Sequence, residues 1–133
     1  MKHDEFIGHV QHRARLDSRG AAERATRAAL ETLRERIPDG LADNLAAQLP
    51  TEVGEHLRRT LIPAAADAGS RFDRHEFIHR VAEAESVDEM AAAYHARVVL
   101  EVVNEATDGH VLDKICDALP DDIADLARAG STD

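Results

Sequence analysis

The chain has 133 residues, 44% of them hydrophobic but only 3% aromatic, which suits one domain with a core of small aliphatic side chains. Its 26 acidic residues against 16 lysines and arginines give a formal net charge of -10, which argues against nucleic acid and anionic membrane surfaces as partners, because both would repel it. No stretch has the roughly 18 apolar residues of a membrane span or resembles a signal peptide, and the single Cys116 allows no internal disulfide, so we expect a cytoplasmic protein.

Four helices are predicted in the first half of the chain. They cover about residues 4–15, 18–36, 41–49 and 51–62. The first carries Phe6, Ile7 and Val10 on one stripe, which is the spacing of a helix with a single buried face. Pro38 breaks the second helix and Pro63 prevents continuation of the fourth, because proline lacks the N–H group that a helix interior needs.

The second half repeats the same order of signals. Its predicted helices cover about residues 73–85, 88–106, 111–119 and 120–129, the second of them opening at Ser86 or Asp88. Asp73 is the predicted cap of the first, and Thr107-Asp108-Gly109 breaks the second. No segment shows the sustained two-residue alternation of a strand. The sequence therefore predicts an all-α fold of eight helices.

An internal duplication explains this order. Asp4-Glu5-Phe6-Ile7 returns as His75-Glu76-Phe77-Ile78, an offset of 71 positions, and from Ala21 onward the offset is 70. The later matches include Ala21-Ala22 with Ala91-Ala92, Leu30-Glu31 with Leu100-Glu101, and Leu49-Pro50 with Leu119-Pro120. We expect one helical domain over residues 1–133, made of repeat one (about 4–62), a linker (about 63–72) and repeat two (about 73–130).

Residues that occur in only one copy are the candidates for a specific role. Cys116 takes the place of Ala46, so we predict a small buried packing residue. His95 takes the place of Ala25 beside an apolar stripe, so we predict a partly buried, hydrogen-bonded imidazole.

Two pairs recur in both copies at i, i+4 spacing, Arg27 with Glu31 and Arg97 with Glu101. Both are predicted on the outer face of the long helices, where each pair forms within its helix or its members reach a neighbouring element or another subunit.

His75-Glu76-Phe77-Ile78-His79 matches H-E-x-x-H, in which two histidines one turn apart bind zinc and the glutamate activates water. Downstream, the segment at 104–108 (Asn-Glu-Ala-Thr-Asp) resembles the one that supplies a third zinc ligand in thermolysin-like enzymes. This pattern keeps a zinc-dependent hydrolase open as the alternative function, with His75 and His79 as metal ligands.

Two observations favour a simpler interpretation of these histidines. The first copy has Asp4 and Gly8 where the second has His75 and His79, so the repeat accounts for the residues between them. The buried stripe of this helix runs through Phe77, which turns both histidines toward solvent. We therefore predict no catalytic residue and no resident cofactor, and we expect any Zn²⁺ or Ni²⁺ binding by the pair to be adventitious.

The chain resembles the helical domain-of-unknown-function family 2267 over nearly its whole length. The residues that carry the resemblance are Asp4-Glu5-Phe6, residues 22–33 (AERATRAALETL), residues 45–50 (LAAQLP), His75-Glu76-Phe77, residues 95–100 (HARVVL) and Leu119-Pro120. The resemblance implies a duplicated helical fold and no known activity, so no site residue follows from it.

The leading hypothesis for function is a non-catalytic helical protein that acts through a protein partner or as a homo-oligomer. A small-ligand pocket between the two repeats is a third hypothesis.

Overall fold

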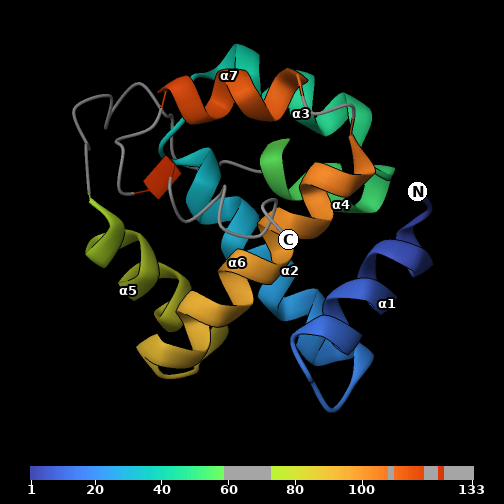
Figure 1. The fold of residues 1–133 in the computed structure, drawn as a ribbon, viewed down its shortest axis with the longest axis vertical. Helices are drawn as coiled ribbons and strands as arrows, with labels where there is room; N and C mark the ends of the chain where they lie inside the picture. Colours follow the sequence, from blue (N-terminus) through green and yellow to red (C-terminus); the bar gives the residue numbers. More distant parts are fainter. Residues whose placement is uncertain (59–72, 108–109, 119–122, 125–133) are drawn as a thin grey trace.

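The computed structural model describes residues 1–58, 73–107, 110–118 and 123–124, and these ranges contain helices and no strand (Figure 1). The all-α prediction is confirmed. The helices are α1 (His3–Arg13), α2 (Arg19–Arg34), α3 (Asp39–Gln48), α4 (Thr51–Arg58), α5 (Arg74–Glu85), α6 (Glu89–Ala106) and α7 (His110–Ala118). Seven of the eight predicted helices are therefore described. The predicted linker, the Leu119-Pro120 junction and most of the eighth helix lie outside the described residues.

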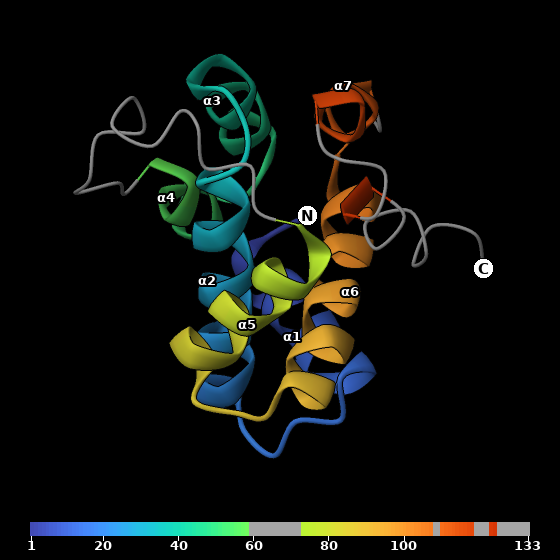
Figure 2. The same ribbon diagram turned by 90° about the vertical axis from the view of Figure 1, so that its left-hand side faces the viewer.

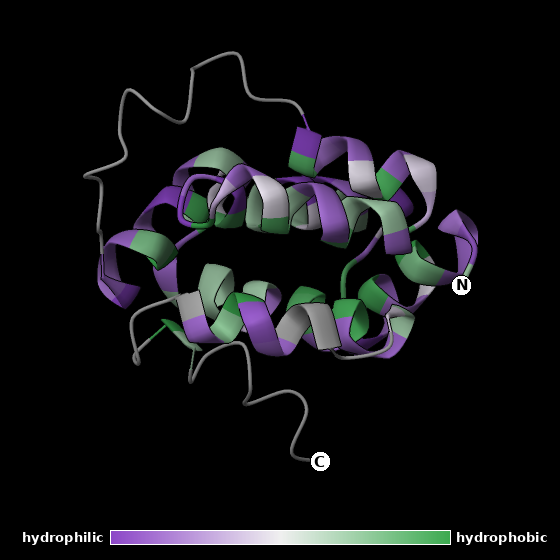
Figure 3. Cartoon of the chain, turned by 90° about the horizontal axis from the view of Figure 1, so that it is seen from above, coloured by the Kyte–Doolittle hydropathy of each residue, from purple (hydrophilic) through white to green (hydrophobic). Residues whose placement is uncertain are grey.

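The two long helices, α2 and α6, form the centre of the molecule and pack against each other. Figure 1 places α5 and α1 on opposite sides of this pair, and each of them contacts both α2 and α6. At one end, α3 and α7 lie side by side, and α4 packs against α2 and α3 (Figure 2). Seen from above, hydrophobic segments face the interior between the helices (Figure 3).

The main packing pairs of six helices have a simple regularity. If α1 is exchanged with α5, α2 with α6 and α3 with α7, the pair α1–α2 becomes α5–α6 and the pair α1–α6 becomes α2–α5, while α2–α6 and α3–α7 stay the same. The two aromatic side chains at the matching positions, Phe6 of α1 and Phe77 of α5, are both fully buried. This is the arrangement that a repeated unit would produce.

The turns after α1 and α5 account for the change of offset. Each has a non-glycine residue in the left-handed region, Arg15 with φ of 55° and Ser86 with φ of 62°. The next helix begins after Ser18 in the first half and after Asp88 in the second, and both side chains accept a hydrogen bond from a backbone N–H of the first turn. From the left-handed residue to the capping residue, the chain therefore advances one position more in the first turn than in the second. The left-handed Arg15 also ends α1 before the predicted boundary at residue 15.

The start of α3 differs from the prediction. The predicted break between α2 and α3 is present, but it covers residues 35–38: Pro38, with φ of -62° and ψ of 151°, precedes the helix, and Asp39 and Gly40 form its first turn. Proline suits this place because the first helical positions do not need its missing N–H.

The core is aliphatic, as the composition predicts, and it runs continuously through both halves. Cys116 is 4% exposed and Ala46 is 3% exposed, so the prediction of a buried packing role for Cys116 is confirmed. Close packing of alanines lets α2 and α6 approach each other: Ala22, Ala29, Ala92 and Ala96 are all fully buried.

Candidate functional site

The H-E-x-x-H segment lies in the first turns of α5, where Asp73 caps the helix by accepting a hydrogen bond from the Glu76 backbone N–H at 2.9 Å. Phe77 points into the core and is fully buried. The His75 side chain is 81% exposed and that of His79 is 45% exposed. The prediction that both histidines face solvent is confirmed.

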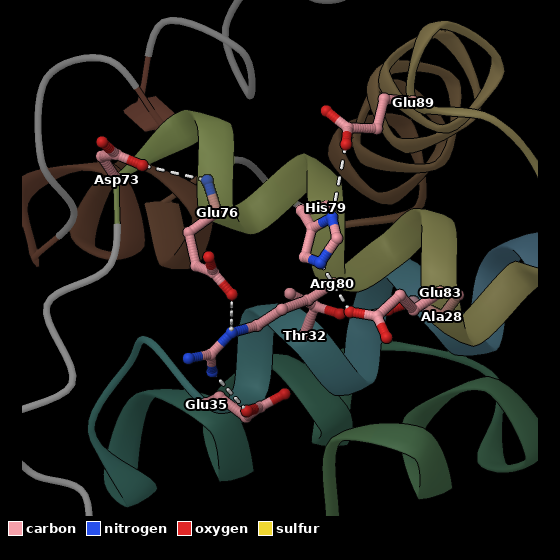
Figure 4. Close-up of polar contacts among 9 residues, drawn as sticks. All are labelled: Ala28, Thr32, Glu35, Asp73, Glu76, His79, Arg80, Glu83 and Glu89. Carbon is pink, nitrogen blue, oxygen red and sulfur yellow. Dashed lines mark hydrogen bonds and ion pairs between the residues drawn. The ribbon is translucent and has the colours of Figure 1, made fainter.

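Two carboxylates form ion pairs with the two imidazoles. His79 Nδ1 lies 3.3 Å from Glu89 Oε2, and its Nε2 lies 2.7 Å from Glu83 Oε1 (Figure 4). His75 Nδ1 lies 4.0 Å from the other oxygen of Glu89. The hydrogen bond to Glu89, followed by the charge of Glu83, raises the pKa of His79. A protonated imidazole has no lone pair for a metal ion, so this setting favours ion pairing.

Glu76 is directed away from the histidines. Figure 4 shows its carboxylate pointing toward Arg80, whose Nε donates to Glu76 Oε2 at 3.0 Å, and Arg80 Nη1 donates to Glu35, the residue after α2, at 2.8 Å. Glu105, the candidate third ligand, is held by Arg13 of α1. Among the residues that the structure describes, no three His, Cys, Asp or Glu side chains form a group that could hold a metal ion. The assignment of His75 and His79 as ligands stays a prediction.

A second polar feature is buried between α5 and α6. Glu85, the last residue of α5, is 3% exposed, and its Oε2 is hydrogen-bonded to Nδ1 of His95, which is 7% exposed. The prediction of a buried, hydrogen-bonded His95 is confirmed. Burial raises the pKa of the Glu85 carboxyl, against the opposing effects of His95 and of Arg24 in α2. Glu85 was not among the residues predicted to be functional. The sequence signal for it is that an acid stands where the matching position of the first copy has Ala14.

The exposed side of α6 is the third feature. Met90 is 85% exposed, an unusual exposure for a large apolar side chain. One and two turns further along the same face lie Tyr94 and Arg97, with the Arg97 guanidinium carbon 5.6 Å from the centre of the Tyr94 ring. The Tyr94 hydroxyl donates to the backbone carbonyl of Arg13 in α1, which fixes the ring. We call Met90, Tyr94 and Arg97 the α6 stripe.

The two predicted i, i+4 pairs have different outcomes. Arg27 Nε lies 3.1 Å from Glu31 Oε2, so the pair in α2 forms as predicted. In α6 the other predicted alternative is found, because Glu101 accepts from Arg13 Nη1 of the neighbouring α1 at 2.7 Å, while Arg97 lies over the Tyr94 ring. The second pair is replaced because α1 presents an arginine to Glu101.

Two open hollows lie on the surface of the first half. One, of about 380 Å³, lies between the start of α1 and the start of α4, and the other, of about 530 Å³, lies along α1 between Gly8 and Leu16. Neither of these two hollows lies between the two halves.

Residues 3–126 match the profile of a protein family described as "Uncharacterized conserved protein (DUF2267)". The chain belongs to the DUF2267 family. The resemblance noted in the sequence is thereby confirmed, and a comparison with curated proteins finds no match. Over the described ranges of this DUF2267 chain, no helix has both the length and the apolarity needed to cross a bilayer.

The three features of this DUF2267 protein differ in what a partner could reach. The histidines of α5 are exposed but already paired with carboxylates, and the Glu85–His95 pair is enclosed. The α6 stripe alone among them offers an accessible apolar group beside an aromatic ring and a cation. These are the groups that protein interfaces use most often.

Proposed function

We propose that this DUF2267 protein acts without catalysis, through protein–protein contact, and that association of two copies through the α6 stripe is its simplest form. The observation that carries the proposal is the 85% exposure of Met90 next to the stacked Tyr94 and Arg97. Methionine, tyrosine and arginine are enriched at interface centres, where large side chains contribute most of the binding free energy. Tyr94 is held in place before binding, which reduces the entropy lost on association.

The charges along α6 favour a second copy as the partner. Asp88 and Glu89 lie at the beginning of the helix, and Arg97 lies about two turns later on the exposed side. Two stripes that cross antiparallel about an axis near Ala93 would place the acids of one copy opposite the Arg97 of the other. Such a two-fold arrangement is the commonest in soluble oligomers.

The stripe belongs to one half only. We propose that the chain is a duplicated four-helix unit with an approximate two-fold relation, in which the eighth helix completes repeat two. The exchange of packing pairs and the matched Phe6 and Phe77 support this relation. The positions that correspond to Met90 and Tyr94 are Gly20 and Arg24, so the first half lacks the apolar part of the stripe.

The test is light scattering at micromolar concentrations, at low and at high salt. The net charge of -10 opposes association when screening is weak, so we expect tighter association as salt rises. Met90→Glu should abolish the dimer. Gly20→Glu is the matched control, because it adds the same charge at the corresponding exposed position of α2. A monomer at both salt concentrations, or equal effects of the two variants, would refute the proposal.

A further inference from the structure

The Glu85–His95 pair is an acid–base pair in a mostly apolar interior. Both side chains are more than nine-tenths buried, and they join the last residue of α5 to the middle of α6. The second carboxylate oxygen, Glu85 Oε1, is buried with no hydrogen-bond partner. An ionised carboxylate in such a place is costly unless its charge is neutralised, so the charge of the pair matters.

The fold does not need this pair. In the first half, Ala14 and Ala25 occupy the corresponding positions, and both are buried, with exposed fractions of 4% and 0%. Two alanines in one half therefore correspond to an acid and a base in the other. Since either polar group alone would leave an unpaired buried charge or donor, the joint presence of both indicates a specific role.

Few charged groups of the described residues act on the pair. Two neighbouring groups act on the carboxyl of Glu85. They are His95 in α6 and the charge of the exposed Arg24 in α2. Burial has the largest effect, and the pKa of Glu85 is raised as a result. The carboxyl thus retains a proton at pH values at which a free glutamic acid has lost it.

We infer that Glu85 and His95 form a pH-sensitive clasp that binds one proton in the folded protein and thereby closes the end of α5 on α6 as an electrically neutral pair. The proton lies between Glu85 Oε2 and His95 Nδ1. When it is lost, the imidazole can still donate to the carboxylate, but the pair then carries a net negative charge in the interior. The junction of α5 and α6 is then destabilised.

The sign of the pH dependence follows from proton counting. A raised carboxyl pKa stabilises the fold fully below the value of the unfolded chain and loses that contribution as pH rises through the folded value. In the unfolded chain the same proton remains on the free imidazole up to about pH 6.5. Wherever the folded pair still holds its proton above that pH, folding takes up a proton, so the unfolding constant rises with pH.

The experiment compares urea unfolding of the native chain with that of Glu85→Met/His95→Leu between pH 5 and pH 9. The double variant has apolar side chains of similar volume and no titratable group at the site. We expect the unfolding constant of the native chain to rise with pH across this range relative to that of the variant. Glu85→Gln, which keeps a hydrogen-bonding side chain, should show the same loss of pH dependence. Parallel curves for the native chain and both variants would overturn the clasp.

A second measurement uses the native chain alone, so it does not depend on whether any variant folds. The side-chain carboxyl ¹³C resonance of Glu85, followed by NMR in the native chain, reports the protonation of this carboxyl directly. We expect its titration midpoint above the ordinary value of 4.5. A midpoint at or below that value would overturn the inference whatever the variants show.

Discussion

The two halves of this DUF2267 protein share a framework and differ in the polar groups built into it. Phe6 in α1 and Phe77 in α5 are equally buried, and both helices contact the same central pair, α2 and α6. Yet Ala14 in the first half corresponds to Glu85 in the second. Both residues are buried, so at this pair of positions an apolar residue in one half stands where an ionisable one stands in the other.

On the outer faces, the two halves have the same charged residues but different contacts. Arg27 and Glu31 form their local pair in α2, whereas the identical sequence pattern in α6 does not. The difference comes from the neighbouring helix: Arg13 of α1 reaches α6, and the corresponding residue of α5 is Ala84. A pattern within one helix therefore does not determine its own contacts when another helix offers a better partner.

The shared framework predicts the largest effects. Phe6→Ala and Phe77→Ala should each reduce the free energy of unfolding by about 3–5 kcal/mol, since each removes a fully buried aromatic ring. Urea denaturation of the two variants measures both costs. If the halves are equivalent, the two losses should be similar.

The control for this pair of variants is His75→Ala, which truncates an exposed side chain on α5 and should change stability by less than about 0.5 kcal/mol. A thermal melt of Phe77→Ala that coincides with that of the native chain would remove Phe77 from the core. Clearly unequal losses for Phe6 and Phe77 would mean that the halves are not energetically equivalent.

Much of the framework could be predicted from the sequence. Apolar residues at helical spacing, such as Phe6, Ile7 and Val10, predicted one buried face of a helix, and all three are buried. The boundaries were less accurate, because they depend on local backbone choices. Arg15 in a left-handed conformation ends α1 early, and the break near Pro38 ends one residue before Asp39, which already belongs to α3.

The polar partners could be predicted only in part. The replacement of Ala25 by His95 indicated a buried imidazole, because the repeat supplied a reference for that position. Its partner Glu85 and the reach of Arg13 to α6 depend on which helices become neighbours. Helix periodicity gives the direction of a side chain but not the helix that faces it.

A close approach of two helices in the first half predicts the next largest effect. A Cβ atom added at Gly54 of α4 would lie 2.7 Å from the backbone carbonyl oxygen of Ala46 in α3, and backbone cannot move aside cheaply. Gly54→Ala should therefore cost about 1–3 kcal/mol of stability. The corresponding residue of the second half is already Ala124, which is buried.

Gly8→Ala is the control for this variant. Gly8 is also helical, in α1, but a Cβ atom there would meet nothing within 4 Å. Its replacement should stabilise the protein by about 0.5–1 kcal/mol, because glycine loses more backbone entropy on folding than alanine does. Chemical denaturation that gives the same sign for both variants would contradict the close approach of α3 and α4.

The smallest effects concern the outer charges. Arg13→Ala should cost about 1 kcal/mol, because Arg13 joins α1 to α6 through Glu101 at 2.7 Å and through two bonds to Glu105 at 2.5 and 2.8 Å. Arg27→Ala removes only an exposed i, i+4 pair and should cost about 0.3 kcal/mol. Urea denaturation at neutral pH compares the two variants, and equal costs would show that the link between helices adds nothing to stability.

The pH dependence of the Arg13→Ala effect separates its charge from its packing. The hydrogen bond from Arg13 is the main cause that lowers the pKa of Glu105. A lowered carboxyl pKa stabilises the fold at pH values above that of the unfolded chain, and the contribution disappears as pH falls through the folded value. The cost of Arg13→Ala should therefore shrink when denaturation is repeated below about pH 4, where carboxyls of the unfolded chain are protonated. If the cost stays constant with pH, the aliphatic part of Arg13 carries the effect, because burial of methylene groups against α6 does not depend on ionisation.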